Sequence, residues 1–338
     1  MTTTRRALLA CAAALIAAPA FAQEVTLRMH QFLPAQANVP TNILDVWADR
    51  VEEDSGGRIE VQRFPAMQLG GTPPELYDQA VDGTADVIWT VAGYTPGRFP
   101  TAEIFELPFI AGEADAEAMS RAYWTMGERH MFDGELSDVH PLGLWVHGPG
   151  LIHADRPIEA VSDLEGLKLR APTRTTTTLF ENLGAAPVGM PVPQVPEALS
   201  RGVIEGAVIP WEVTGALRLP ELVGNHTEFG DQTLYTTAFL FVMNEDAYEA
   251  LPEDLQAVID ENSGLEFSAF AGAQMAEDDG PARQAAVDAG NNIVTLTPEQ
   301  VAEWQAAAQP VTDAWIEGNA DGRALVDEAR ALIEENAM

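Results

Sequence analysis

Apolar and polar residues alternate in two stretches of the first half of the chain, a third stretch is largely apolar, and a helical spacing lies between the stretches. Leu44, Trp47 and Val51 share one face of the first helical stretch, and Gly56-Gly57 ends it. Thr72-Pro-Pro-Glu75 opens the second with a capping box and a proline in the first turn. The pattern predicts strands at 25–32, 58–64 and 85–91, with helices at 41–55 and 72–82.

The same order of elements recurs in the middle of the chain. A glycine joins helix to strand in each half, in Val81-Asp-Gly-Thr-Ala-Asp-Val-Ile88 and in Ser200-Arg-Gly-Val-Ile-Glu-Gly-Ala207. Because the strands are largely apolar, each half is expected to form a parallel sheet covered by helices. The second set comprises strands at 167–171, 186–190 and 203–209 and helices at 175–183 and 194–201.

The remaining segments connect the two halves. Residues 141–153 are predicted to be a strand that crosses between domains, and 236–243 a strand that returns the chain to the first. A long helical stretch, 245–290, and helices at 298–318 and 322–336 follow. The expected fold class is α/β, with two domains and a ligand cleft between their strand ends, where open sheets bind ligands.

The N-terminus has the features of an export signal. Arg5 and Arg6 precede an apolar run at 8–18, and Ala20-Phe21-Ala22 fits a cleavage site, so residues 1–22 are assigned to a signal peptide. Ordinary secretion is favoured over a twin-arginine route. Cys11 lies inside this signal, so no disulfide is expected in the mature chain. No later apolar run reaches about 18 residues, so membrane insertion is not expected.

The chain is strongly acidic. Its formal net charge is −34, from 52 acidic and 18 basic residues. Such a surface repels nucleic acid and anionic membranes, and neither is an expected partner. Drawing a small anion toward this field therefore requires a dedicated cation.

No catalytic set or metal motif stands out. The six histidines show no HExxH spacing, and neither Gly-x-Ser-x-Gly nor a phosphate loop occurs. No enzyme activity, metal or cofactor is therefore expected. Arg170 instead ends an apolar strand in Gly166-Leu-Lys-Leu-Arg170-Ala-Pro172. Its planar fork of donors suits a carboxylate. The alternative is that Arg170 pairs with a surface acid.

Several further motifs occur in order along the chain: Phe64-Pro65-x-x-Gln68-Leu69-Gly70-Gly71, Glu106-Leu107-Pro108-Phe109, Leu183-Gly-Ala-x-Pro187-Val-x-Met190 and Leu251-Pro-Glu-Asp-Leu255. Together with the Arg170 motif they resemble the DctP-like substrate-binding proteins of tripartite ATP-independent periplasmic (TRAP) transporters. This resemblance implies a type II-like periplasmic binding protein with a long C-terminal helical region. It also implies that Arg170 clamps the ligand carboxylate. The expected domains are 24–147 plus 236–274 and 148–235 plus 275–338.

Two departures from the family pattern bear on the ligand. Many members have a second arginine where this chain reads Gly148-Pro149-Gly150, and Glu-Asn-Pro where it reads Val208-Ile209-Pro210. These changes favour a monocarboxylate with an apolar or aromatic body. Candidate pocket residues are Trp89, Tyr94, Trp211, Gln31 and Phe32, with a place in the core as the alternative for Trp89. Arg174 fits a second anion contact or a surface role equally well.

The resemblance implies a periplasmic receptor in a Gram-negative bacterium. It would capture a small organic acid and deliver it to the small and large membrane subunits of a TRAP permease. Two alternatives stay open. One is a periplasmic enzyme on the same two-lobed scaffold, and the other is a ligand receptor for a sensor protein.

Overall fold

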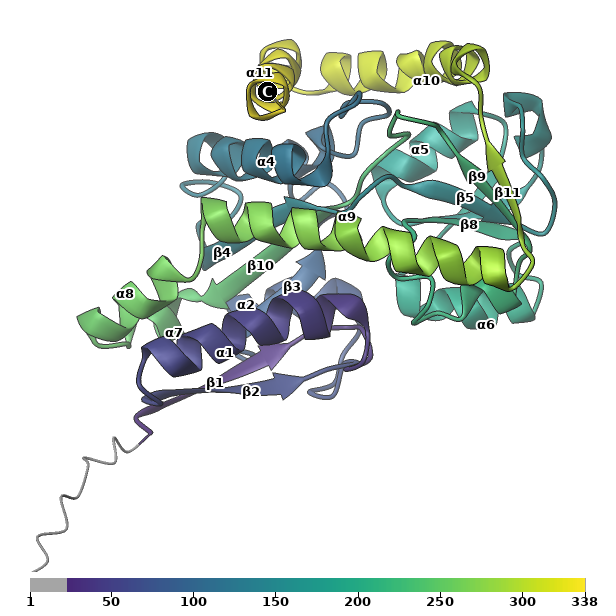
Figure 1. Ribbon diagram of the computed structural model, residues 1–338. Coiled ribbons are helices and arrows are strands. Elements are labelled where there is room, and N and C mark those ends of the chain that lie inside the picture. Colours follow the sequence, from purple (N-terminus) through teal and green to yellow (C-terminus); the bar gives the residue numbers. More distant parts are fainter. Residues whose placement is uncertain (1–22, 338) are drawn as a thin grey trace, which may run out of the picture.

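The computed structural model describes residues 23–337, and the predicted signal peptide lies outside the described residues. The chain forms two sheets, each with helices packed on its faces (Figure 1). The α/β two-domain fold class is thereby confirmed. The first sheet has the order β2(Ile59–Phe64)-β1(Val25–His30)-β3(Val87–Val91)-β10(Ala238–Asn244)-β4(Val139–Val146). The second has the order β11(Asn292–Thr295)-β9(Asn225–Glu228)-β5(Leu151–Ala154)-β8(Gly206–Ile209)-β6(Lys168–Ala171)-β7(Ala186–Gly189).

Neither sheet is purely parallel, so that expectation was wrong. In the first sheet, β10 runs antiparallel to both β3 and β4. In the second, β5 runs antiparallel to both β8 and β9. Both exceptions come from segments that carry the chain between the domains. A segment that arrives from the other domain enters the sheet at the edge that faces that domain. It therefore runs in the direction opposite to the strands that end there.

The crossing predicted at 141–153 is two strands, one in each sheet. β4 ends at Val146 and β5 begins at Leu151, with Gly148-Pro149-Gly150 between them. Proline has no backbone N–H to donate to a ladder, and the chain leaves the first sheet before Pro149. The bend brings His147 and Gly150 to the junction of the two domains.

The long helical stretch predicted at 245–290 is three helices, α7(Glu245–Glu249), α8(Glu253–Glu261) and α9(Leu265–Asp288). Pro252 caps the start of α8. Gly264 precedes α9 with a φ of 87°, a conformation that favours glycine. Pro252 and Gly264 therefore divide the stretch into separate helices, which the helical periodicity alone did not predict.

The other helices cover the two sheets. Thr72 and Glu75 form the predicted capping box, whereas α3 and α4 were not anticipated. The α-helices are α1(Asp45–Asp54), α2(Leu76–Val81), α3(Pro100–Ile104), α4(Ala116–His130), α5(Arg174–Asn182), α6(Val195–Ser200), α10(Pro298–Gly318) and α11(Gly322–Asn336). Short turns of other helix types are η1(Pro40–Leu44), η2(Pro73–Glu75), η3(Ala92–Tyr94), η4(Val161–Leu164), η5(Val192–Gln194) and η6(Leu219–Glu221).

Helix α9 spans both domains (Figure 1). Near its start it packs on α4 and β4 of the first domain. Near its end, Ala286 packs with Leu151 and Trp211 of the second. Helix α11 returns to the first domain and packs on α4. The exact domain boundaries stay a prediction. Among residues 23–337, no helix is long and apolar enough to cross a membrane.

Candidate ligand-binding site

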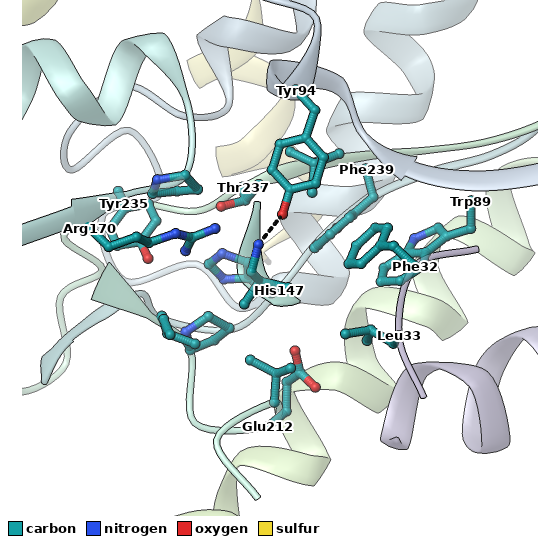
Figure 2. Close-up of a pocket in the computed structure, with 16 residues that line it drawn as sticks. Phe32, Leu33, Trp89, Tyr94, His147, Arg170, Glu212, Tyr235, Thr237 and Phe239 are labelled. Atoms are coloured by element: carbon teal, nitrogen blue, oxygen red, sulfur yellow. Dashed lines mark hydrogen bonds between the residues drawn. The ribbon is translucent and has the colours of Figure 1, made fainter. Parts of the chain in front are cut away.

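A cavity lies between the two sheets, where strands of both domains end. Most of its lining is apolar or aromatic, with a few polar groups (Figure 2). The lining residues are Phe32, Leu33, Trp89, Val91, Tyr94, His147, Arg170, Pro172, Val192, Ile209, Pro210, Glu212, Val213, Tyr235, Thr237 and Phe239.

Arg170 brings a buried cation to this cavity. Its side chain comes from β6, and the residue is only 2% exposed. Nε donates to the carbonyl of Met190 and Nη1 to that of Val208, each at 3.0 Å, so the fork is fixed, and the hydroxyl of Tyr94 lies beside it. No carboxylate among the described residues pairs with it. Burial lowers the pKa of Arg170 from its ordinary value, yet arginine stays charged in proteins.

A buried charge without a counter-ion is costly, because desolvation is not repaid by a partner. Arg170 therefore makes the cavity favourable for an anion. Beside it, the hydroxyl of Tyr235 is buried and has no hydrogen-bond partner among the described residues. An anion bound at Nη2 of Arg170 would offer Tyr235 an acceptor as well.

His147 faces the cavity as a neutral acceptor. Nδ1 lies 2.5 Å from the carbonyl of Gly148, so Nδ1 must be the donor. Nε2 then carries the lone pair of the neutral ring, and this nitrogen is buried without a partner among the described residues. Burial, together with the nearby charge of Arg170, lowers the pKa of His147 to about 4. At neutral pH this histidine carries no charge, which leaves Arg170 as the cation of the cavity lining.

Aromatic rings form one wall of the cavity. Phe32 stacks on Trp89 with centroids 4.6 Å apart, and Trp89 stacks on Phe239 at 5.1 Å. Trp89 is also 1% exposed and packs toward Trp145, so it belongs to both the core and the wall. Stacked rings of this kind suit a flat apolar ligand body.

Tyr94 connects the two domains across the cavity. It lies in η3 of the first domain, and its hydroxyl accepts from the backbone N–H of Val192 in the second at 2.9 Å. Figure 2 shows the ring of Tyr94 on the same side of the cavity as Phe239, with its hydroxyl directed inward. A hydrogen bond between lobes that close on a ligand stabilises the closed state.

The substitution Tyr94→Phe is expected to weaken ligand binding by about 5- to 30-fold, because the buried N–H of Val192 loses its acceptor at a cost of about 1–2 kcal/mol. Isothermal titration calorimetry on both proteins measures this. Tyr248→Phe, which changes a half-buried tyrosine that is paired with Asp260 and lies outside the cavity lining, serves as the control and should bind as the wild type does. Equal affinities for Tyr94→Phe and wild type would contradict a closing role.

Two predicted pocket residues lie elsewhere. Trp211 points away from the cavity: its indole donates to Glu228 at 3.0 Å, and its ring packs on His153 and His226. The amide of Gln31 is bound to the backbone of Leu33, and Gln31 lines a separate hollow. Arg170, Tyr94, Trp89 and Phe32 are brought together as expected.

Sequence reasoning missed Tyr235, Thr237, Phe239, His147 and Glu212. The first three alternate along the segment that enters β10, a spacing that places them on one face. That spacing was a readable signal. Arg174, left open between two roles, pairs with Glu103 at 2.7 Å and thereby joins α5 to α3.

Packing explains why no second arginine occupies the crossing segment. A Cβ at Gly148 would lie 2.2 Å from the carboxylate of Asp279. A Cβ at Gly150 would lie 2.2 Å from the ring of Tyr235. Either side chain would displace a neighbour at the edge of the cavity, so a single arginine serves the site. Among residues 23–337, no cluster of His, Cys, Asp and Glu fits a metal ion.

Two lobes with a buried, partly apolar cavity between them and one fixed cation are the architecture of a solute-binding protein. The model for bacterial extracellular solute-binding protein, family 7 (DctP), matches residues 31–319, and the chain belongs to this family. It is a TRAP-type solute-binding protein. Two curated relatives, DctP of Rhodobacter capsulatus and the ectoine-binding protein TeaA of Halomonas elongata, are named as periplasmic proteins.

Solved structures and a curated relative support the assignment to this family. A TRAP solute-binding protein from Rhodoferax ferrireducens T118, in complex with copurified benzoate, is 46% identical, with a TM-score of 0.90 over 92% of this chain and 98% of that one. A marine metagenome TRAP protein specific for aromatic acid ligands, with 3-hydroxybenzoate, is 44% identical, with a TM-score of 0.91 over 94% and 100%. The C4-dicarboxylate-binding periplasmic protein DctP of Rhodobacter capsulatus is 26% identical over 78% of each chain.

Proposed function

We propose that this protein captures a small aromatic monocarboxylate in the periplasm and delivers it to a TRAP permease. The observation that carries the proposal is Arg170, a buried guanidinium with no acidic partner among the described residues, in a cavity walled by aromatic rings. The carboxylate binds Nη2 of Arg170, with Tyr235 as a second donor. The ring of the ligand lies against Phe32, Trp89 and Phe239.

The similar solved structures support an aromatic ligand. Benzoate and 3-hydroxybenzoate are the acids bound in the two proteins that share 46% and 44% of their residues with this chain. Both are flat and carry one carboxylate, which matches one arginine and a stacked wall. A dicarboxylate would bury its second charge in a cavity whose lining has no second cation, at a desolvation cost.

The proposal also assigns residues 1–22 to export and the mature chain to transport alone. No pair of described residues in the cavity supplies a nucleophile with its base, because His147 is already bound to Gly148 and faces no hydroxyl partner. Incubation of benzoate with the protein should return benzoate unchanged. A new product in nuclear magnetic resonance spectra would favour the enzyme alternative.

A thermal-shift screen tests the ligand class. At 100 times its dissociation constant, a ligand adds about 2.7 kcal/mol to the free energy of unfolding. Benzoate and hydroxybenzoates are expected to raise Tm, whereas succinate at the same concentration is expected to leave it unchanged. A response to succinate but not to benzoate would overturn the proposed ligand class.

A further inference from the structure

We propose that Glu212 makes a second polar contact with the ligand and selects aromatic monocarboxylates that carry a ring hydroxyl. This inference rests on the proposed function and narrows its ligand. It concerns a carboxyl group that lines the same cavity as Arg170. The resemblance to the family assigned no role to this position.

Glu212 is held at its backbone on both sides. Its N–H donates to Asp279 Oδ1 at 2.8 Å, and its carbonyl accepts from Asn38 Nδ2 at 3.1 Å. Asp279 lies in α9, and Asn38 lies in the first domain before η1. The backbone of Glu212 is therefore fixed by two separate parts of the molecule, which also fixes the direction of its side chain.

The side chain itself is buried and unpaired. Glu212 is only 5% exposed, and the groups that act on its carboxyl are two neighbouring carboxylates, Asp279 and Asp278, with no cation paired to it among the described residues. Figure 2 shows the carboxyl turned toward the interior of the cavity, on the side of Leu33, away from the guanidinium of Arg170. Buried polar groups in proteins almost always have a partner, so the ligand is the natural candidate.

The protonation state of Glu212 decides which ligand groups suit it. Burial, reinforced by the nearby carboxylates of Asp279 and Asp278, raises the pKa of Glu212 well above its usual range. Asp279 is half-buried, and desolvation raises its pKa to about 7. Burial therefore favours the neutral carboxylic acid form of Glu212, which has one donor and a free acceptor oxygen.

A hydroxyl group matches such a carboxylic acid, because it can accept from the O–H of Glu212 and donate to the other oxygen. A second ligand carboxylate would meet either a neutral acid with one donor or, if Glu212 ionised, a like charge. With the first carboxylate at Arg170, the complementary ligand is an aromatic ring that bears one carboxylate and one hydroxyl. The marine metagenome TRAP protein in complex with 3-hydroxybenzoate shows that a TRAP solute-binding protein can bind a ligand of this class.

Calorimetric titration of the mature chain with benzoate, 3-hydroxybenzoate and 4-hydroxybenzoate tests the inference. The measured quantity is the ratio of the benzoate dissociation constant to that of the better hydroxybenzoate. For the wild type a ratio of at least about 10 is expected, because benzoate leaves the polar group of Glu212 unpaired. For Glu212→Leu the ratio should fall to within about 2-fold of one, and Glu212→Gln should keep part of the preference, since an amide also donates and accepts.

Glu106→Gln is the matched control. Glu106 is a second buried carboxyl, 1% exposed, whose pKa burial raises to about 8, but it is not part of the cavity lining. Its variant should keep the wild-type ratio. An unchanged ratio in Glu212→Leu, or a wild-type ratio near one, overturns the inference while leaving the proposed function intact. If none of the three acids binds the wild type, the proposed function fails and this inference fails with it.

Discussion

Replacing Arg170 with alanine is expected to weaken the binding of benzoate by about 100-fold or more. Truncating one partner of a buried, hydrogen-bonded charge pair typically costs about 2–5 kcal/mol. No other residue of the cavity lining carries a positive charge, since His147 is neutral. The strongly negative chain, at −34, offers the ligand no substitute attraction. Isothermal titration calorimetry at fixed salt measures the loss directly.

Arg170→Lys separates charge from geometry. Lysine keeps the cation but loses the planar fork that bonds Met190 and Val208 while presenting Nη2 to the ligand. We expect an affinity between those of the wild type and the alanine variant. Arg201→Ala removes an exposed arginine paired with Glu197, and it should bind as the wild type does. If Arg170→Ala binds benzoate within about 3-fold of the wild type, the anchoring role is wrong.

The position of Arg170 could be predicted because it depends on local pattern. An apolar run that ends in arginine and is followed by Pro172 places the side chain at a strand end, and the repeated order of strands and helices places that end at the cleft. Trp89 was predicted by the same reasoning from the matching strand of the first half, and Tyr94 was predicted from the turn that follows that strand.

The same reasoning failed at Trp211 because β8 ends at Ile209. Within a strand, side chains alternate between faces, but beyond Pro210 that period no longer applies. The chain turns so that Trp211 packs on His226, and Glu212 faces the cavity instead. Trp211 was the better candidate by residue type, because aromatic side chains often line pockets. The next residue, Glu212, lines the cavity in its place.

Whether a strand runs parallel or antiparallel to its neighbours also could not be predicted from the sequence. A strand buried on both faces is a continuous apolar run whether its neighbours are parallel or antiparallel. Residues 238–244 of β10 are all buried, so their composition carries no sign of the antiparallel pairing. The consequence for the site is large, because this strand and the segment before it supply Phe239, Thr237 and Tyr235. Only the arrangement of the two crossings shows that they meet Arg170.

Trp89→Ala is expected to lower the free energy of unfolding of the ligand-free protein by about 3–5 kcal/mol, the usual cost of removing a large buried aromatic side chain. Trp89 is 1% exposed and stacks between Phe32 and Phe239. Its indole N–H has no hydrogen-bond partner among the described residues. Trp89→Phe gives up that unpaired donor along with part of the ring, so its stability loss should be smaller than that of alanine. Urea unfolding followed by circular dichroism measures both variants.

The cavity distinguishes Trp89 from other buried tryptophans. Trp124 is 7% exposed and packs on Phe132 at 5.0 Å, on α4 and outside the cavity lining. Trp124→Ala should therefore destabilise the fold but leave the affinity for benzoate unchanged at temperatures where the variant is folded. Trp89→Ala should lose both stability and affinity, because the ring of the ligand loses the middle of its stacked wall. Wild-type affinity in a folded Trp89→Ala variant would show that Trp89 supports the core alone and that the aromatic body of the ligand lies elsewhere.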